Sequence, residues 1–232
     1  MKLYQYPHNA YVGTNIPKNR LYQQGKGGAA IEQLFIDEIE RITWQFKLSA
    51  ATLNLQVDEK LPEFQIFHIQ ARVPQISESI LHYIDKQIPS PIIFELEYCN
   101  QITVAAAYKR ISLTDGNKSV QGRYYFSDGL PADASRQPLP FYLKLSDLYA
   151  HLIDRLLPLS ANANIMPSEN IQQRLIQAQE HQRLQKQIDQ LKSRIKKEKQ
   201  FNRQAELNQQ LAHLERSLNQ FKQPQKIQGK PS

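Results

Sequence analysis

The sequence contains a single cysteine, Cys99, and no hydrophobic run long enough to cross a membrane. One cysteine cannot form an internal disulfide, and a membrane-spanning helix needs about 20 consecutive apolar residues. The first residues alternate polar and aromatic side chains, without the apolar stretch of a signal peptide. We therefore expect a soluble cytoplasmic protein with no membrane partner, in which Cys99 is buried as a small apolar side chain.

The motifs of common nucleotide-binding and zinc-dependent enzymes are also missing. The sequence has no glycine-rich phosphate-binding loop, no dinucleotide-binding turn and no two-histidine helix of a zinc hydrolase. Its six histidines lie singly along the chain, without the spacing of metal ligands. The sequence thus predicts no cofactor and no metal, and favours a protein that is not an enzyme.

The positive charge of the chain is concentrated at its C-terminal end. The net charge is +7, but residues 1–167 contain 16 bases and 16 acids. Residues 168–232 contain the other 13 bases and 6 acids, and so carry the whole excess. Because clustered Lys and Arg side chains attract nucleic-acid phosphates, the C-terminal segment is the expected contact region for DNA.

The pattern of residues 31–159 predicts an α+β domain. Apolar side chains at helical spacing predict helices at residues 31–46, 76–88 and 148–156. Runs of β-branched and aromatic residues predict strands at residues 64–73, 91–98, 102–109 and 122–127. This order suggests a mainly antiparallel sheet with helices packed on one face. Pro and Gly in residues 1–30 predict an irregular N-terminal arm.

A linker is expected at residues 160–167, followed by a basic coiled-coil tail at residues 168–221 and a disordered end at residues 222–232. The tail contains no Pro or Gly, and its apolar residues recur in two blocks at heptad-like spacing. The blocks are Leu184, Ile188, Leu191, Ile195, and Leu207, Leu211, Leu214, Leu218, Phe221.

The spacing between these blocks leaves three arrangements of the tail open. Ile195 and Leu207 are twelve residues apart, which does not fit a heptad. The tail is either one long helix with a register shift or an antiparallel hairpin that folds back near Phe201. We favour the hairpin, because its two apolar stripes can bury each other. A homo-oligomer formed through the first block is the third arrangement.

Two groups of charged residues are candidate sites. A basic cluster in the tail would bind DNA phosphates non-specifically, although charge runs on helices are more often solvated faces. This cluster comprises Lys192, Arg194, Lys196, Lys197, Lys199 and Arg203. Alternatively, Glu95, Glu97 and Lys109 on two adjacent strands resemble the magnesium-binding carboxylates and the lysine of some nucleases. Such nucleases place the lysine two residues after the second carboxylate, where this chain has Cys99.

Several segments of the chain resemble a bacterial family, domain of unknown function 4391. The segments are Ile16–Tyr22, Ile42–Ser49, Thr52–Leu55, Phe94–Tyr98 and Lys197–Asn208. The resemblance implies genes that neighbour Snf2-type helicases, DNA methyltransferases and type III-like restriction subunits in anti-phage defence regions. It thus implies a non-catalytic accessory subunit that docks a helicase, methyltransferase or restriction subunit, with DNA as a further partner. A metal-dependent nuclease and a stand-alone nucleic-acid-binding protein are the alternatives.

Overall fold

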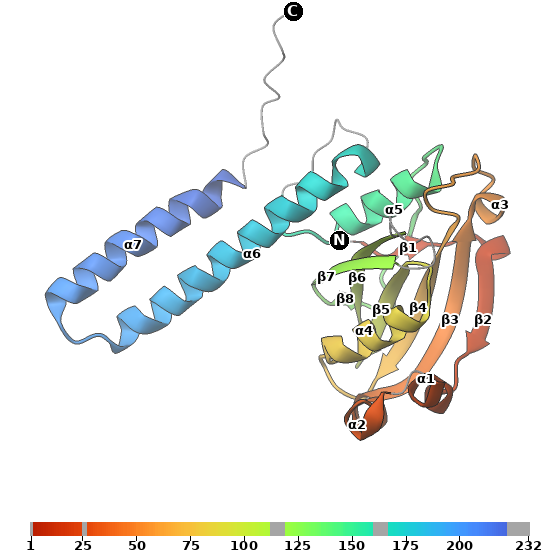
Figure 1. The fold of residues 1–232 in the computed structure, drawn as a ribbon, viewed down its shortest axis with the longest axis horizontal. Coiled ribbons are helices and arrows are strands. Elements are labelled where there is room, and N and C mark those ends of the chain that lie inside the picture. The colour runs from red at the N-terminus through yellow and green to blue at the C-terminus, as the bar shows by residue number, and fades with distance from the viewer. Residues whose placement is uncertain (1, 25–26, 112–118, 160–166, 222–232) are drawn as a thin grey trace, which may run out of the picture. The chain divides into compact units, whose positions relative to one another are not determined.

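The computed structural model describes residues 2–24, 27–111, 119–159 and 167–221. The chain divides into two compact units, residues 1–156 and residues 157–232, and we describe each by itself (Figure 1). Of the helices in the described residues, none is long and apolar enough to span a membrane. The linker expected before Pro167 and the C-terminal end expected at residues 222–232 fall outside the described residues.

The first unit is built on a sheet of seven strands in the order β2-β3-β4-β5-β6-β7, with β8 paired to β6. Neighbouring strands are antiparallel except β4 and β5, which are parallel because α4 crosses over between them. The prediction of a mainly antiparallel sheet is therefore confirmed. The strands are β2 (Tyr11–Asn15), β3 (Ile39–Ser49), β4 (Glu63–Ala71), β5 (Ile92–Tyr98), β6 (Gln101–Ile111), β7 (Ser119–Phe126) and β8 (Leu130–Pro131).

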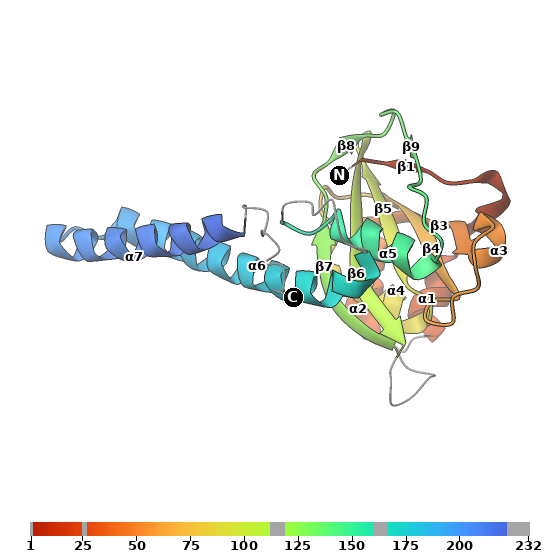
Figure 2. The ribbon, with the colours of Figure 1, turned by 90° about the horizontal axis from the view of Figure 1, so that it is seen from above.

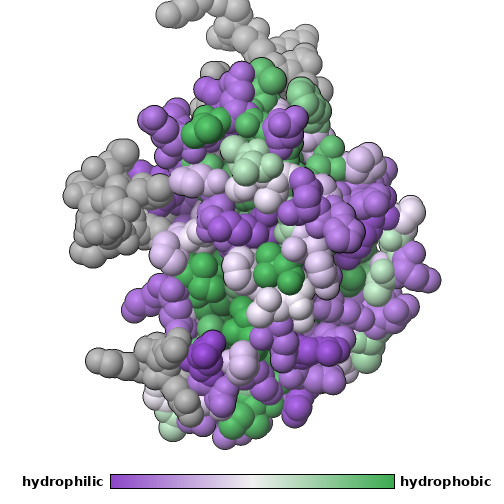
Figure 3. Space-filling model, turned by 90° about the vertical axis from the view of Figure 1, so that its right-hand side faces the viewer, coloured by the Kyte–Doolittle hydropathy of each residue, from purple (hydrophilic) through white to green (hydrophobic). Residues whose placement is uncertain are grey.

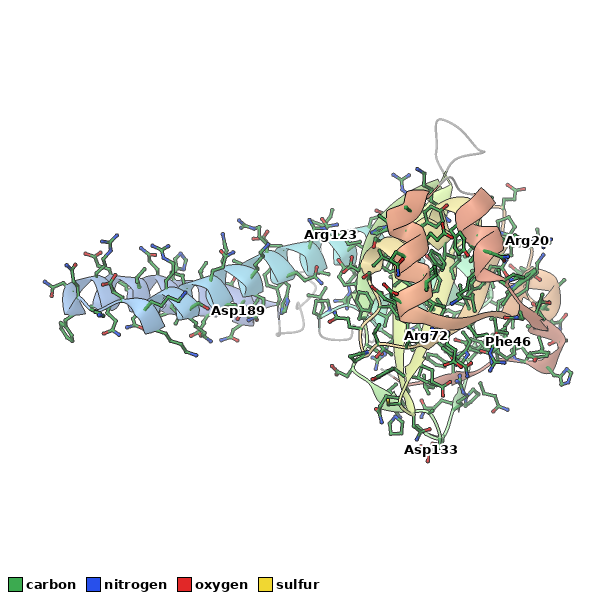
Figure 4. All side chains as sticks on the ribbon, turned by 90° about the horizontal axis from the view of Figure 1, so that it is seen from below. Arg20, Phe46, Arg72, Arg123, Asp133 and Asp189 are labelled. Carbon is green, nitrogen blue, oxygen red and sulfur yellow. The ribbon has the colours of Figure 1, made fainter. Side chains whose placement is uncertain are left out.

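Helices cover both faces of this sheet, and the prediction that they share one face is wrong. One face packs against α1 (Lys18–Gln24), α2 (Gly28–Glu38) and α4 (Glu78–Gln87). On the other face, Tyr149 of α5 (Leu145–Asp154) contacts the rings of Phe64 and Tyr108. Two opposite views agree: α5 lies in front of the sheet in Figure 2, and α1 and α2 lie in front of it in Figure 4.

The helix expected at residues 31–46 ends at Glu38, and its second half is the strand β3. The register of β3 against β4 shifts between Ile39 and Arg41 and again between Trp44 and Phe46. Each bulge adds one residue to the strand and so changes which side chains share a face. Ile39 and Ile42, three residues apart, thus both lie in the α2 and α4 core. The first bulge therefore gave this part of the strand the apolar spacing of a helix.

The N-terminal arm is more regular than its prolines and glycines predicted. Besides β2 and α1, it contains the strand β1 (Tyr4–Gln5), which pairs in parallel with β9 (Gln137–Pro138), and a short helix η1 (His8–Ala10). A further short helix, α3 (Ala50–Leu53), follows β3. Seen from the side of β2 and α3, hydrophobic and hydrophilic side chains are mixed over the surface (Figure 3).

The cysteine lies in the turn between β5 and β6 and is exposed, so the expectation of a buried Cys99 is wrong. Both Cys99 and Asn100 have positive φ angles, of 44° and 61°. Two consecutive residues in this region are typical of the tightest hairpin turns, which match the twist of the paired strands. The turn therefore ends the apolar run of β5 one residue before the cysteine.

The second unit contains two helices that pack as an antiparallel hairpin, α6 (Pro167–Lys197) and α7 (Phe201–Gln220). Leu184 and Ile188 of α6 bury their side chains against Leu218 of α7, and Lys192 pairs with Glu215 at 2.9 Å. The connection comprises Glu198–Gln200. The hairpin that we favoured is thus present within one chain, whereas coiled-coil packing and a homo-oligomer stay predictions.

The apolar positions of the tail take different degrees of burial in this hairpin. Of the nine apolar residues in the two blocks, five are buried and four are half-buried. The buried ones are Leu184, Ile188, Leu191, Leu207 and Leu218, and the half-buried ones are Ile195, Leu211, Leu214 and Phe221.

We expect the Tyr149 hydroxyl to stabilise the sheet where β6 is irregular. The β6–β7 register shifts between Ala107 and Lys109, and there the hydroxyl accepts from the Lys109 amide (3.0 Å) and donates to the Ala107 carbonyl (3.1 Å). Tyr149→Phe removes a buried hydrogen bond from each of these two backbone groups, and should lower the free energy of unfolding by about 1–3 kcal/mol in urea titrations.

Tyr125→Phe is the matched control for this variant. The Tyr125 hydroxyl is buried and has no hydrogen-bond partner among the described residues. Its removal should leave the free energy of unfolding unchanged or slightly raised. Equal losses in the two variants would contradict the role of the Tyr149 hydroxyl.

Candidate functional site

Glu95 of β5 is a buried carboxylate held by an arginine. Glu95 is 1% exposed. The Arg136 guanidinium donates to the two carboxylate oxygens of Glu95, at 2.9 Å to Oε1 and 2.7 Å to Oε2. Arg136 also donates to the Tyr4 carbonyl, and the Tyr6 hydroxyl hydrogen-bonds Glu95. Burial, followed by the nearby Glu95 charge, raises the pKa of Tyr6. Glu95 therefore joins the N-terminal arm and the segment before β9 to the centre of the sheet.

Glu97 lies two residues further along β5 and on the same face, as the alternation of a strand requires. It pairs with His68 of the parallel strand β4, with Nε2 and Oε2 2.8 Å apart. The Glu97 side chain is 30% exposed and the His68 side chain 17%. Glu97 is thus partly accessible to solvent, whereas Glu95 is buried.

Lys109 lies on the other face of the sheet, with its ammonium in the core. The residue is 3% exposed, and Nζ donates to the Asp85 carbonyl at 2.6 Å and also to the Ile88 carbonyl. Nζ lies 3.2 Å from the Asp85 carboxylate. These acceptors lie at the C-terminal end of α4, where a cation is electrostatically favoured. Lys109 therefore acts as a buried cap of α4.

Asp85 completes this buried network on the α4 side. Its other carboxylate oxygen accepts from the Tyr124 hydroxyl at 2.6 Å and from Gln121 at 2.8 Å. Burial raises the pKa of the Asp85 carboxyl, while the Lys109 charge and the Tyr124 hydrogen bond act against that rise. The same burial, with the Asp85 charge, raises the pKa of Tyr124.

The structure therefore does not bring Glu95, Glu97 and Lys109 together. The two glutamates lie on the face covered by α5 and the N-terminal arm, and Lys109 lies on the face covered by α4. Among the described residues, no three His, Cys, Asp or Glu side chains are grouped so that they could hold a metal ion. The nuclease arrangement expected from these three residues is not formed.

Two clefts open on the first unit. One, of about 820 Å³, lies between the N-terminal arm and α3, with Tyr6, Tyr11 and Phe46 in its walls. The other, of about 640 Å³, lies where the parallel strands β4 and β5 end, beside Ile76 and Cys99. No Asp, Glu, Lys or Arg of the described residues lines either cleft. Neither cleft thus presents a carboxylate, an ammonium or a guanidinium group of the described residues.

The basic cluster lies at one end of the helical hairpin, where α6 is joined to α7. We call its six residues, Lys192, Arg194, Lys196, Lys197, Lys199 and Arg203, the basic end of the hairpin. All six are exposed. Lys192 pairs with Glu215, and Arg203 lies 3.7 Å from Glu198. The other four have no ion pair with any described residue.

Glu198 is the acid within the basic end, and its carboxylate is directed at the backbone. One oxygen accepts from the amides of Lys199 (2.9 Å) and Gln200 (3.0 Å). The hydrogen bond from the Gln200 amide lowers the pKa of this carboxyl most. The Lys199 amide and the charges of Arg203 and Arg194 also lower this pKa, while desolvation acts in the opposite direction. Because Glu198 shapes the connection between the helices, it leaves the outer surface of the basic end positive.

Phe201 is the residue that sequence reasoning undervalued. It is the first residue of α7 and is 81% exposed, between Lys199 and Arg203. The sequence showed an aromatic residue within a basic run, which is a signal for stacking on bases, but not whether its ring is buried. Figure 4 shows polar side chains projecting from the outer surfaces of both helices, among them the labelled Asp189.

One of three comparisons with known proteins gives a match. A family model described as "Domain of unknown function (DUF4391)" matches residues 5–218, which include both structural units. No curated protein and no solved structure matches the chain.

We expect Arg136→Met to destabilise the first unit, because it leaves Glu95 charged and buried without its partner. Loss of one partner from such a pair should lower the free energy of unfolding by about 3 kcal/mol, at the low end of the usual range because Arg136 is partly exposed. Limited proteolysis should also cut the N-terminal arm faster, since Arg136 holds the Tyr4 carbonyl.

Arg123→Met is the matched control for Arg136. Arg123 is an exposed residue of β7, so the same substitution there should change the free energy of unfolding by less than about 0.5 kcal/mol. An Arg136 variant as stable as the Arg123 variant would show that the pair with Glu95 does not hold the arm.

Proposed function

The chain belongs to the DUF4391 family, and we propose that it is a non-catalytic accessory subunit that binds DNA through the basic end of its helical hairpin. The observation that carries this proposal is the position of the cluster. Six bases separated by up to eleven residues in sequence surround one short connection between two helices, and four of them have no ion pair among the described residues. Such a surface attracts the phosphate backbone without reading base sequence.

The helix dipoles account for only part of this cluster. Arg194, Lys196 and Lys197 lie in the last turn of α6, where positive charge stabilises the helix. Lys199 and Arg203 lie before and within the first turn of α7, where positive charge is unfavourable. The first turn of α7 has no acidic residue, and the Gln200 side chain does not cap it. Helix stability alone therefore gives no reason for bases on both sides of the connection.

A solvated polar face is the competing explanation of the cluster. On such a face, bases and acids usually alternate along the helix and pair three or four residues apart. Arg183 and Glu180 of α6 form a pair of this kind, with atoms 2.6 Å apart. The basic end departs from that pattern: one oxygen of its acid Glu198 accepts from backbone amides and the other lies 3.7 Å from Arg203, and four of the six bases have no ion pair with any described residue. This contrast within one helix supports a binding role for the basic end.

The partner protein is the second part of the proposal. We propose that the α+β unit docks a helicase, methyltransferase or restriction subunit of a defence system in the cytoplasm. The resemblance of the chain to its family supports this choice of partner class. The α+β unit itself is suited to docking, because its buried charges are paired internally and its two clefts are lined by apolar and neutral polar groups.

Neutralising the basic end should weaken DNA binding and its dependence on salt. The variant Lys196→Gln, Lys197→Gln, Lys199→Gln removes three exposed charges. For each phosphate that the protein no longer neutralises, the slope of log affinity against log salt should fall by about 0.9 for a duplex. We expect a loss of at least tenfold in affinity at low salt, measured by fluorescence anisotropy with labelled DNA over a salt series.

A control variant with the same change in net charge distinguishes an effect of the basic end from an effect of the protein's total charge. Arg183, Lys186 and Arg216 are exposed bases of α6 and α7 outside the basic end. Their combined change to Gln should alter affinity by less than about threefold, since long-range effects of exposed charges are screened by salt. Equal losses in both variants would attribute binding to net charge alone and contradict the proposal.

The partner is tested by pull-down of the full-length protein with each of the three candidate subunits. We expect one of them to be retained, and the Lys196, Lys197 and Lys199 variant to retain it equally well, because the α+β unit is unchanged. Failure of all three candidates to bind would contradict the accessory role and leave a stand-alone DNA-binding protein.

A further inference from the structure

Phe201 is an exposed aromatic side chain that makes no contribution to the packing of the hairpin. It is 81% exposed and takes no part in the apolar cluster of Leu184, Ile188 and Leu218. The aromatic ring at the other end of α7, Phe221, packs instead against that cluster and against His181. Of the two aromatic rings in the described hairpin, one is thus used for packing and the other lies in solvent.

Several basic residues lie near Phe201 in the sequence. Lys199 and Arg203 lie two residues to either side of Phe201, and Lys197 ends α6 across the connection. An aromatic ring beside Lys and Arg side chains is the combination that binds single-stranded nucleic acid, in which bases stack on the ring and phosphates meet the positive side chains of the protein. In a duplex, the bases are already stacked on one another and their faces are not accessible to the ring.

A lipid surface fits this end of the hairpin less well. Peripheral membrane binding through a protein tip needs an apolar surface of several side chains. In the described residues of α6 and α7, only Ile176 and Phe201 are large hydrophobic side chains with high exposure. Ile176 lies near the start of α6, far along the chain from the basic end. A single ring among six bases favours nucleic acid.

We propose that Phe201 stacks on an unpaired base, so that the basic end of the hairpin binds single-stranded DNA more tightly than duplex DNA. This inference rests on the proposed DNA-binding function and names its substrate. Lys and Arg side chains neutralise the phosphates on both sides of the stacked base. Because a π face is common to all bases, the site should have little sequence preference.

The test compares Phe201→Ala and Phe201→Trp in the full-length protein with labelled single-stranded and duplex DNA of the same sequence. Phe201→Ala should weaken single-stranded binding by about fivefold to a hundredfold, the usual effect of removing a stacking ring. It should change duplex binding by less than about twofold, because phosphate contacts remain. Phe201→Trp should restore single-stranded binding, since indole stacks at least as well.

Two further measurements separate stacking from a change in structure. A single strand containing 2-aminopurine should lose fluorescence on binding the unaltered protein, and lose less on binding Phe201→Ala. Thermal unfolding of Phe201→Ala should match that of the unaltered protein, because the ring is exposed. Ile176→Ala, which removes the other exposed apolar side chain of the hairpin, is the control and should bind both DNA forms normally.

Each contrary result has a distinct meaning. If Phe201→Ala binds both DNA forms normally while the Lys196, Lys197 and Lys199 variant loses both, the stacking role is overturned and the DNA-binding function remains. Equal weakening of both DNA forms by Phe201→Ala also overturns a preference for unpaired bases. If the unaltered protein binds neither form, the proposed function fails first. Phe201-dependent binding to anionic phosphatidylserine vesicles without DNA binding would replace the inference with a membrane contact.

Discussion

The charged group of Lys109 lies in the interior of the α+β unit, and the arrangement of α4, β6 and β7 depends on it. A buried ammonium is tolerated only when acceptors surround it. Here the acceptors are the carboxylate of Asp85 and the last carbonyls of α4, including those of Asp85 and Ile88. Since Tyr124 of β7 donates to the same carboxylate, a displacement of either strand or of the helix would leave a buried charge unsatisfied.

On the other face of the sheet, the ion pair of Glu95 and Arg136 has the same structural role. Glu95 and Arg136 connect the centre of the sheet to the N-terminal arm, so each face has an ion pair that contacts the segments covering it. The carboxylates and the lysine that make a nuclease site plausible in sequence are thus engaged in holding the fold. The excess positive charge of the sequence lies instead in residues 168–232, where all six residues of the basic end of the hairpin are exposed.

Helices and strands whose apolar residues recur at one regular spacing were predicted correctly. The prediction was wrong where the backbone of β3 is irregular. The spacing of Ile76, Ile80 and Ile84 correctly predicted α4, and runs of β-branched and aromatic residues correctly predicted β4, β5 and β6. Ile39 and Ile42 were assigned to a helix because the bulges of β3 are backbone features with no local signal in the side chains. The twelve-residue gap between the apolar blocks of the tail left several arrangements open, and the hairpin was favoured because its two apolar stripes can bury each other.

The candidate sites show a similar division between local and long-range information. The basic end of the hairpin is contiguous in sequence, so its members could be named without knowledge of the fold. Glu95 and Lys109 were grouped because adjacent strands bring residues close. Their alternation places them on opposite faces, and Lys109 finds Asp85 on a helix 24 residues earlier in the chain. The burial of Glu95 and the exposure of Phe201 and Cys99 could not be predicted, because the immediate sequence neighbours of these residues do not determine how accessible they are.

The charges that hold the α+β unit together are buried, whereas the charges of the basic end are exposed. This difference determines which substitutions can report on function in this protein. Residues that hold the α+β unit together are buried and paired, so any substitution there changes stability and activity at once. Residues of the basic end are exposed, and Phe201 is not among the apolar side chains that join α6 to α7. Their substitution alters the surface while leaving the packing in place. A change in binding at the basic end can therefore be attributed to the substituted side chain itself, which the buried pairs of the α+β unit would never allow.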